Sequence, residues 1–193
     1  QSGMFWLGIN EKIFPLTPHF MEMGILYRCA SMSLSLGWTN GPGKMMGLAP
    51  YGKPTFFTEK FVGNYFDYLP HRKKSQVADW LDYCLFQAKE LGYDISKLGD
   101  KNSPTAPINS EIAASTQKLL EETILKSCHT INIILNNLLV KTQKICMSGG
   151  VMLNCPSNTR VWKESNFSDV FINPACDDSG LSLGAALWLY HNL

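Results

Sequence analysis

Residues 144–190 read KICMSGGVMLNCPSNTRVWKESNFSDVFINPACDDSGLSLGAALWLY, and their pattern predicts the fold class. Short apolar runs typical of strands, at 144–147 and 169–172, alternate with helical patterns at about 156–164 and 179–190. Two strands separated by a helix favour a parallel sheet, because neighbouring parallel strands need a crossover connection. We therefore predict an α/β protein.

The beginning of the chain predicts a hairpin and then a helix. Residues 4–9 and 12–16 are rich in aromatic and β-branched side chains and flank a turn at 10–11. A helix is expected at about 20–36, ended by Gly37. Its buried face would be formed by apolar residues three and four positions apart, namely Met23, Leu26, Tyr27, Ala30 and Leu34.

The middle of the chain predicts a loop, a cover and a long helix. Residues 39–54 are rich in Gly and Pro, which favours a constrained loop with short helical pieces at most. Strand-like aromatic residues from position 55 give way to Lys73 and Lys74 and then to a helix at about 76–91. The long helix is expected at about 109–140, with Asn109 as its N-cap.

Composition excludes some classes of protein. Seventeen basic and sixteen acidic side chains give a formal charge of +1, so neither nucleic acid nor an anionic membrane is an expected partner. The six cysteines lack CxxC spacing, and we expect reduced thiols. Without a signal peptide or a run of about eighteen apolar residues, the expected location is cytoplasmic.

Two turns that follow the predicted strands carry the candidate chemistry. The first, SGGVMLN at 148–154, has paired glycines that let a phosphate approach the backbone closely. The second, NPACDDSG at 173–180, brings two carboxylates beside the first, where a metal or a magnesium-bound phosphate could use them. In the alternative interpretation, Asp178 caps the last helix, Asp177 faces water, and the glycines at 180 and 184 serve packing.

Other polar residues leave two interpretations open. Asn154 could cap the helix that follows it or contact a ligand. Lys44 could donate to a phosphate or carbonyl oxygen, although a lone lysine is more often a solvated surface group. The histidines, including His19 and His71, lack the spacing of metal ligands, and Cys176 is interpreted as a buried thiol.

Five segments, in order, resemble motifs of the NodU/CmcH-type O-carbamoyltransferase family. The most specific is GKMMGLAPYG at 43–52, which is similar to the family signature GKVMGLAPYG. GILY at 24–27, IAASTQ at 112–117, SGGVMLNC at 148–155 and PACDDSGLSLGAAL at 174–187 resemble the other motifs. Together they extend over nearly the whole chain.

The resemblance implies an incomplete ribonuclease-H-like fold of the actin, sugar-kinase and chaperone ATPase superfamily, related to the tRNA threonylcarbamoyl transferases. Residues 1–54 would end the first half, 55–108 would form a helical cover, and 109–193 would form the second half. The implied reaction moves a carbamoyl group from carbamoyl adenylate to a hydroxyl of a small-molecule or sugar acceptor. Another domain of the same protein would make the adenylate from carbamoyl phosphate and ATP, so this chain alone is expected to be inactive.

The resemblance also implies roles for individual residues. Lys44 and Asn154 would act in catalysis, and Asp178 would bind a divalent metal, iron, whose other ligands lie upstream. The nucleotide would be bound by a set of turn residues, namely Ser148, Gly149, Gly150, Asn154 and Gly180. Pro42 replaces a usual Glu and Asp177 a usual Gly, so local loop geometry is expected to differ. The alternatives are a tRNA threonylcarbamoyl transferase-like domain and a non-catalytic nucleotide-binding module.

Overall fold

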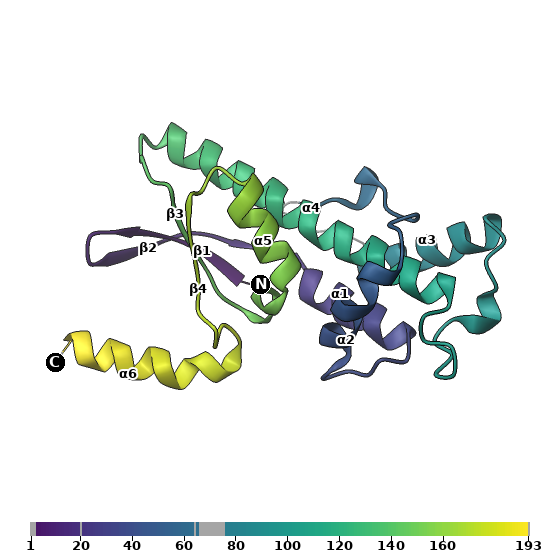
Figure 1. Ribbon diagram of the computed structural model, residues 1–193. Helices are drawn as coiled ribbons and strands as arrows, with labels where there is room; N and C mark the ends of the chain where they lie inside the picture. The colour runs from purple at the N-terminus through teal and green to yellow at the C-terminus, as the bar shows by residue number, and fades with distance from the viewer. Residues whose placement is uncertain (1–2, 20, 64, 66–75, 193) are drawn as a thin grey trace. The chain divides into compact units, whose positions relative to one another are not determined.

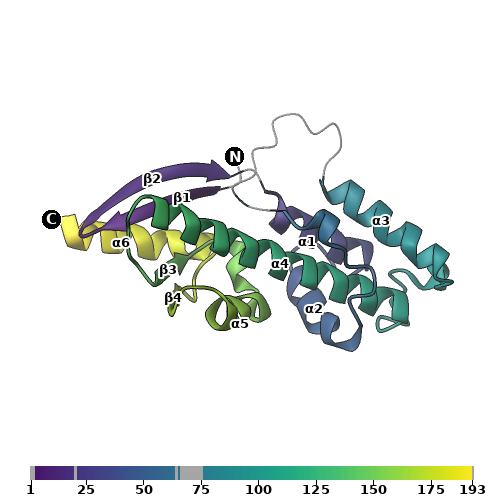
Figure 2. The ribbon, with the colours of Figure 1, turned by 90° about the horizontal axis from the view of Figure 1, so that it is seen from above.

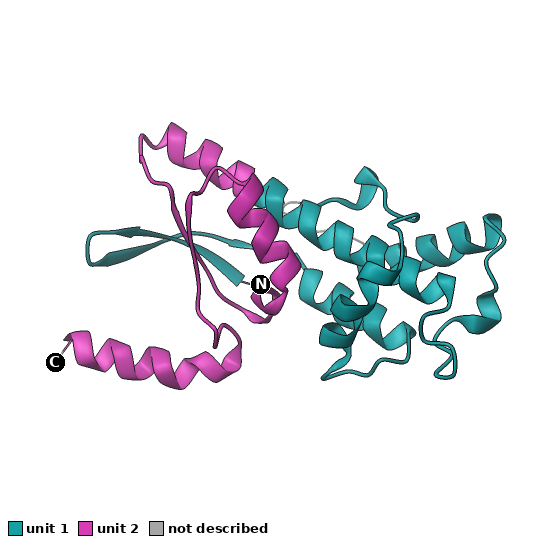
Figure 3. Cartoon of the chain, in the orientation of Figure 1, with its two compact units in different colours: residues 1–127 teal, residues 128–193 magenta. Residues whose placement is uncertain are grey.

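The computed structural model describes residues 3–19, 21–63, 65 and 76–192. The chain divides into two compact units, unit 1 at Gln1–Ser127 and unit 2 at Cys128–Leu193 (Figure 3). The protein is a mixed α/β chain with two small sheets, as the predicted class requires. The boundary between the units lies within one helix, and the predicted division at residues 54 and 108 stays a prediction.

Unit 1 begins with the predicted hairpin. Strand β1 (Gly3–Ile9) pairs antiparallel with β2 (Lys12–His19), and Ile9 lies opposite Lys12 at the turn (Figure 1). Asn10 has a φ of 54°, a left-handed conformation that asparagine tolerates better than most residues. The hairpin prediction is confirmed.

Helix α1 (Met23–Ser33) follows, and it is shorter than predicted. It ends early because Ser35, with a φ of 57°, leaves the right-handed helical region before Gly37 is reached. Phe20, where the helix was expected to start, lies outside the described residues. The predicted apolar face is confirmed, since all five of its residues are buried: Met23, Leu26, Tyr27, Ala30 and Leu34.

The Gly- and Pro-rich segment is more helical than the predicted loop with short helical pieces. Helix α2 (Gly41–Leu48) continues directly into a 3-10 turn, η1 (Ala49–Tyr51), and packs beside α1 (Figures 1 and 2). Pro42 lies in the first helical turn, where its fixed φ suits a helix and its missing N–H costs no hydrogen bond. Burial of Met45 and Leu48 against unit 1 outweighs the weak helix propensity of the glycines.

The next segment contains two 3-10 turns, η2 (Glu59–Phe61) and η3 (Ile95–Lys97), and helix α3 (Gln76–Glu90), which confirms the predicted helix. The strand-like residues after position 55 form no strand within 55–63. Their backbone instead bonds to side chains, as where Phe56 N donates to Ser115 Oγ at 3.0 Å. Lys73 and Lys74 lie outside the described residues.

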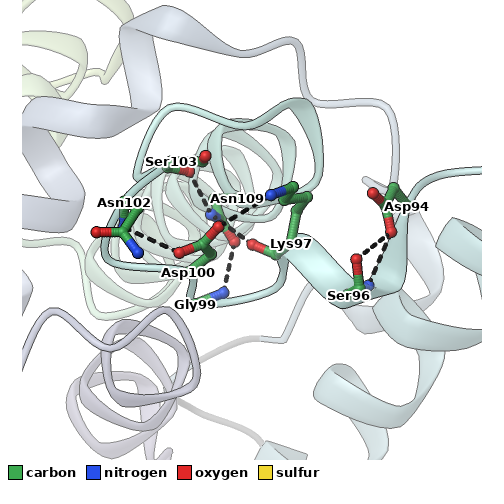
Figure 4. Close-up of polar contacts among 8 residues, drawn as sticks. All are labelled: Asp94, Ser96, Lys97, Gly99, Asp100, Asn102, Ser103 and Asn109. Carbon is green, nitrogen blue, oxygen red and sulfur yellow. Dashed lines mark hydrogen bonds and ion pairs between the residues drawn. The ribbon is translucent and has the colours of Figure 1, made fainter.

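Helix α4 (Pro107–Asn137) confirms the long predicted helix but begins before Asn109, so Asn109 is not its N-cap. Proline suits the first helical position. The Asn109 side chain instead holds the loop that precedes the helix (Figure 4). It accepts from Gly99 N at 2.9 Å and donates to the carbonyls of Lys97 and Ser103 at 3.0 and 3.2 Å.

Unit 2 has the predicted alternation of strands and helices. Strands β3 (Lys144–Met147) and β4 (Asp169–Ile172) are parallel and occupy the predicted positions (Figure 1). A 3-10 turn, η4 (Gly150–Leu153), and α5 (Cys155–Glu164) connect them. After β4 come another 3-10 turn, η5 (Asp178–Gly180), and α6 (Leu181–Asn192), in which no residue is buried. No described helix has the length and hydropathy to cross a membrane.

Candidate functional site

The turns after β3 and β4 lie against each other in unit 2. Gly149 N donates to the Cys176 carbonyl oxygen at 2.5 Å, and Ser148 Oγ donates to the same oxygen at 3.2 Å. Parallel pairing of the two strands brings their carboxyl ends to one edge, which explains this contact. The two candidate segments therefore contact each other at Cys176.

The glycines of these turns differ in what surrounds them. A Cβ on Gly149 or Gly150 would meet no atom within 4 Å, so space is open beside both. Gly149 also has a φ of 105°, a conformation that favours glycine. A Cβ on Gly180 would overlap the Ala175 carbonyl oxygen, which makes Gly180 a packing residue. Gly184 has open space instead, so its predicted packing role is wrong in this structure.

The capping interpretation made Asp178 the cap and left Asp177 facing water, and the structure shows the reverse. Asp177 is the cap, because its Oδ1 accepts from Ser179 N at 3.0 Å and from Ser179 Oγ at 2.5 Å. These two hydrogen bonds lower the pKa of Asp177, and the bond from the Ser179 hydroxyl has the larger effect. Asp178 is exposed, and no hydrogen bond or ion pair to its carboxylate occurs among the described residues. Asp178 is thus the carboxylate available to a ligand.

Asn154 caps α5, one of the two functions that its position allowed. Its Oδ1 accepts from Ser157 N at 3.0 Å and from Ser157 Oγ at 2.8 Å, and the residue is 7% exposed. Its contact with a ligand stays a prediction. Asn158, for which no role was predicted, connects the first turn to α5 by donating from Nδ2 to Met152 O at 2.7 Å. Its spacing of one helical turn from Asn154 was the only available signal.

Lys44 lies on the exposed side of α2 in unit 1. Gly43 and Gly47 on either side have no atom within 4 Å of an added Cβ, so this side of the helix is bare. No ion pair of Lys44 is found in the described part of the chain. The catalytic role of Lys44 stays a prediction.

The residues present do not make a complete iron site. No group of three or more His, Cys, Asp or Glu side chains able to hold a metal occurs among the described residues, and Asp178 is a single donor. His71 lies outside the described residues. His19 packs its ring edge-on against Tyr65, and burial lowers its pKa. We therefore derive no step of a reaction through a metal.

The cysteine thiols are free, as expected. Cys176 is buried, and burial raises the pKa of its thiol. A buried thiol with a raised pKa is a poor nucleophile, so the interpretation of Cys176 as a buried thiol is confirmed.

A pocket of about 450 Å³ in unit 1 was not predicted. Its walls include Thr55, Tyr93, Lys97 and the first residues of α4. These residues come from segments far apart in the sequence, and no local pattern marks them as neighbours. None of the predicted site residues lines this pocket.

Comparison with known proteins shows to which class the chain belongs. Residues 3–187 match the family model described as Carbamoyltransferase N-terminus. The chain is a member of this carbamoyltransferase family, which confirms the resemblance inferred from the motifs.

Three relatives illustrate the similarity. An uncharacterised protein of Synechocystis is 31% identical over 96% of this chain and 30% of its own length. Nodulation protein NolNO of Sinorhizobium fredii and nodulation protein NolO of Bradyrhizobium diazoefficiens are each 27% identical over 100% of this chain. The chain spans 26% and 33% of those two proteins, so it covers about a third or less of these curated relatives.

Proposed function

We propose that this chain takes part in transferring a carbamoyl group to a hydroxyl group of a small molecule or sugar. The observation that carries the proposal is the joined pair of turns in unit 2, where Gly149 N binds the Cys176 carbonyl. The first turn contains two open glycines, and the exposed Asp178 lies two residues after Cys176 in the second turn. Membership of the carbamoyltransferase family supports the group that is transferred.

The proposed donor is carbamoyl adenylate, formed elsewhere in the same protein from carbamoyl phosphate and ATP. The acceptor oxygen attacks the carbamoyl carbon, a new C–O bond forms, and the bond from that carbon to the phosphate oxygen breaks. AMP leaves with the electron pair, and the hydroxyl proton passes to solvent. Catalysis requires fixed dipoles near the carbonyl and the leaving phosphate, because negative charge develops on both.

The turn residues suit the phosphate end of this donor. Open space beside Gly149 and Gly150 lets a phosphate approach the backbone more closely than any side chain would allow. In the proposal, Ser148 and Gly180 keep the two turns in place, by a hydrogen bond and by close packing. Asp178 is the proposed metal ligand, and iron would need further donors from outside the described residues.

Lys44 and Asn154 have separate parts in the proposal. Lys44 would stabilise an anionic oxygen as a mobile point charge. Asn154 would orient the first turn through its cap on α5, and its carboxamide would line the carbamoyl end. We also propose that β3, α5, β4 and α6 are part of a ribonuclease-H-like half, which the parallel strand pairing supports.

The first experiment uses a matched pair of glycines. Gly150→Ala adds a methyl group to open space without backbone strain, and Gly184→Ala does the same on α6, away from the turns. Binding of AMP and ATP should weaken about tenfold or more in Gly150→Ala and stay within twofold in Gly184→Ala, measured by isothermal titration calorimetry. Equal affinities in both variants would remove the nucleotide site from this turn.

The second experiment tests transfer itself. The longest natural polypeptide that carries this chain is supplied with ATP, radiolabelled carbamoyl phosphate and a panel of hydroxylated acceptors. Asp178→Asn should abolish label transfer, whereas Asp177→Asn, which alters the cap, should retain most of it. Nucleotide binding without transfer to any acceptor would favour the non-catalytic module, and label transferred only to tRNA would favour the tRNA-modifying alternative.

A further inference from the structure

Helix α2 is too small to hold its own position. It has eight residues, of which Gly41, Met45 and Leu48 are buried, and isolated helices of this length are unstable in water. What fixes the position of α2, and with it the backbone of Lys44, must therefore lie in the contacts on either side of the helix.

The first contact is at the start of α2. A Cβ on Gly41 would fall against the Ser31 side chain of α1, so the two helices approach closely there. Ser31 Oγ itself donates to the Arg28 carbonyl at 2.7 Å, which keeps this side chain in one place.

The second contact follows α2, on the buried face of α4. A Cβ on Gly52 would overlap the Ser110 carbonyl oxygen, so the backbone of the 43–52 motif touches the backbone of α4. Four residues later, Phe56 N donates to Ser115 Oγ at 3.0 Å, and Phe56 is 1% exposed. The chain leaving α2 is thus held at two places along α4.

We propose that Ser115 is a positioning residue that holds the 49–56 segment on α4 and thereby fixes the position of α2, the helix that carries Lys44. Ser115 is fully buried, and its hydroxyl is the acceptor for an amide that would otherwise be buried without a partner. The importance of Lys44 for transfer rests on the proposed function, whereas the positioning of its segment does not.

The neighbouring residue supplies a matched control. Thr116 is as buried as Ser115, and its Oγ1 accepts from Trp80 Nε1 of α3 at 3.0 Å. Thr116→Val removes one buried acceptor with little change of shape, as Ser115→Ala does, but the bond that is lost belongs to a different segment. The two variants therefore distinguish a local loss of structure at residues 41–56 from a general destabilisation of unit 1.

Hydrogen exchange measured by mass spectrometry on the whole chain tests the inference without any assay of activity. Ser115→Ala should raise exchange across 41–56 about tenfold or more and leave α3 within twofold, and Thr116→Val should do the reverse. Ser115→Cys keeps a weak acceptor of similar size and should fall between wild type and Ser115→Ala. Equal exchange across 41–56 in Ser115→Ala and wild type would overturn the inference.

A double-mutant cycle connects the inference to the proposed reaction. If Ser115 acts through Lys44, Ser115→Ala should lower kcat in the wild-type background and have no further effect in Lys44→Met. Equal losses in both backgrounds would show a general structural effect and overturn the link to Lys44. Absence of transfer in the wild type would refute the proposed function and leave the exchange result as the test of positioning.

Discussion

The buried face of α4 and the turns after β3 and β4 use polar groups in opposite ways. On α4, side chains such as Ser115, Thr116 and Gln117 each bond to a different covering segment in unit 1. At the turns, the Gly149 amide and the Ser148 hydroxyl both donate to the Cys176 carbonyl, while the Asp178 carboxylate and the space beside two glycines stay open. Buried polar groups whose hydrogen bonds are all made within the protein indicate a structural role. Exposed polar groups without a partner, next to a fixed backbone, indicate where a ligand could bind.

The largest loss of stability is expected from substitution of Trp80. This side chain is 0% exposed and bonds to Thr116, so Trp80→Ala should lower the free energy of unfolding by about 3–5 kcal/mol. Trp188 in α6 is 65% exposed, and Trp188→Ala should change the free energy of unfolding by less than about 0.5 kcal/mol. Urea unfolding followed by far-ultraviolet circular dichroism measures both, and similar losses would contradict the structural role of the buried α4 face.

A smaller effect is expected where the 43–52 motif meets α4. Gly52→Ala would force a methyl group against the Ser110 carbonyl and should cost about 1–3 kcal/mol. Gly47→Ala, within α2 and beside open space, should instead stabilise the protein by roughly 0.5–1 kcal/mol. Thermal unfolding of the two variants should therefore shift in opposite directions, and a neutral Gly52→Ala would show that this contact can relax.

The adjacent glycines of the first turn, Gly149 and Gly150, are expected to differ in their effect on stability. Gly149→Ala places a side chain in a left-handed conformation and should destabilise unit 2 by about 1–3 kcal/mol. Gly150→Ala should cost less than about 0.5 kcal/mol, because neither strain nor a clash opposes it. Hydrogen exchange of β3 and α5 reports both values, and equal destabilisation would mean that the turn differs in solution.

The smallest effect is expected from pH, at the half-buried His19 of unit 1. Burial lowers the pKa of His19 below 6.5, so the unfolded chain binds a proton there more readily than the folded chain. Stability should therefore be full above pH 6.5 and decline as the pH falls toward the lowered pKa. His19→Gln should reduce the change of melting temperature between pH 7 and pH 5, and an unchanged pH dependence in this variant would contradict the prediction.

Periodic patterns predicted the hairpin, the buried face of α1, α4 and the strands of unit 2, because each depends on local spacing of apolar side chains. The helical state of residues 41–48 could not be predicted in this way, since burial of Met45 and Leu48 outweighs local propensity. Motifs indicated the two turns, but not that Asp177 rather than Asp178 is the cap. That choice depends on backbone angles within a single turn.

The bond from Gly149 N to the carbonyl of Cys176 uses main-chain atoms only. The bond therefore does not depend directly on which side chain stands at position 176. Substitutions that fit the buried position 176 should keep this bond. Proline at 149 would remove the amide donor and leave the Ser148 hydroxyl as the remaining donor to this oxygen.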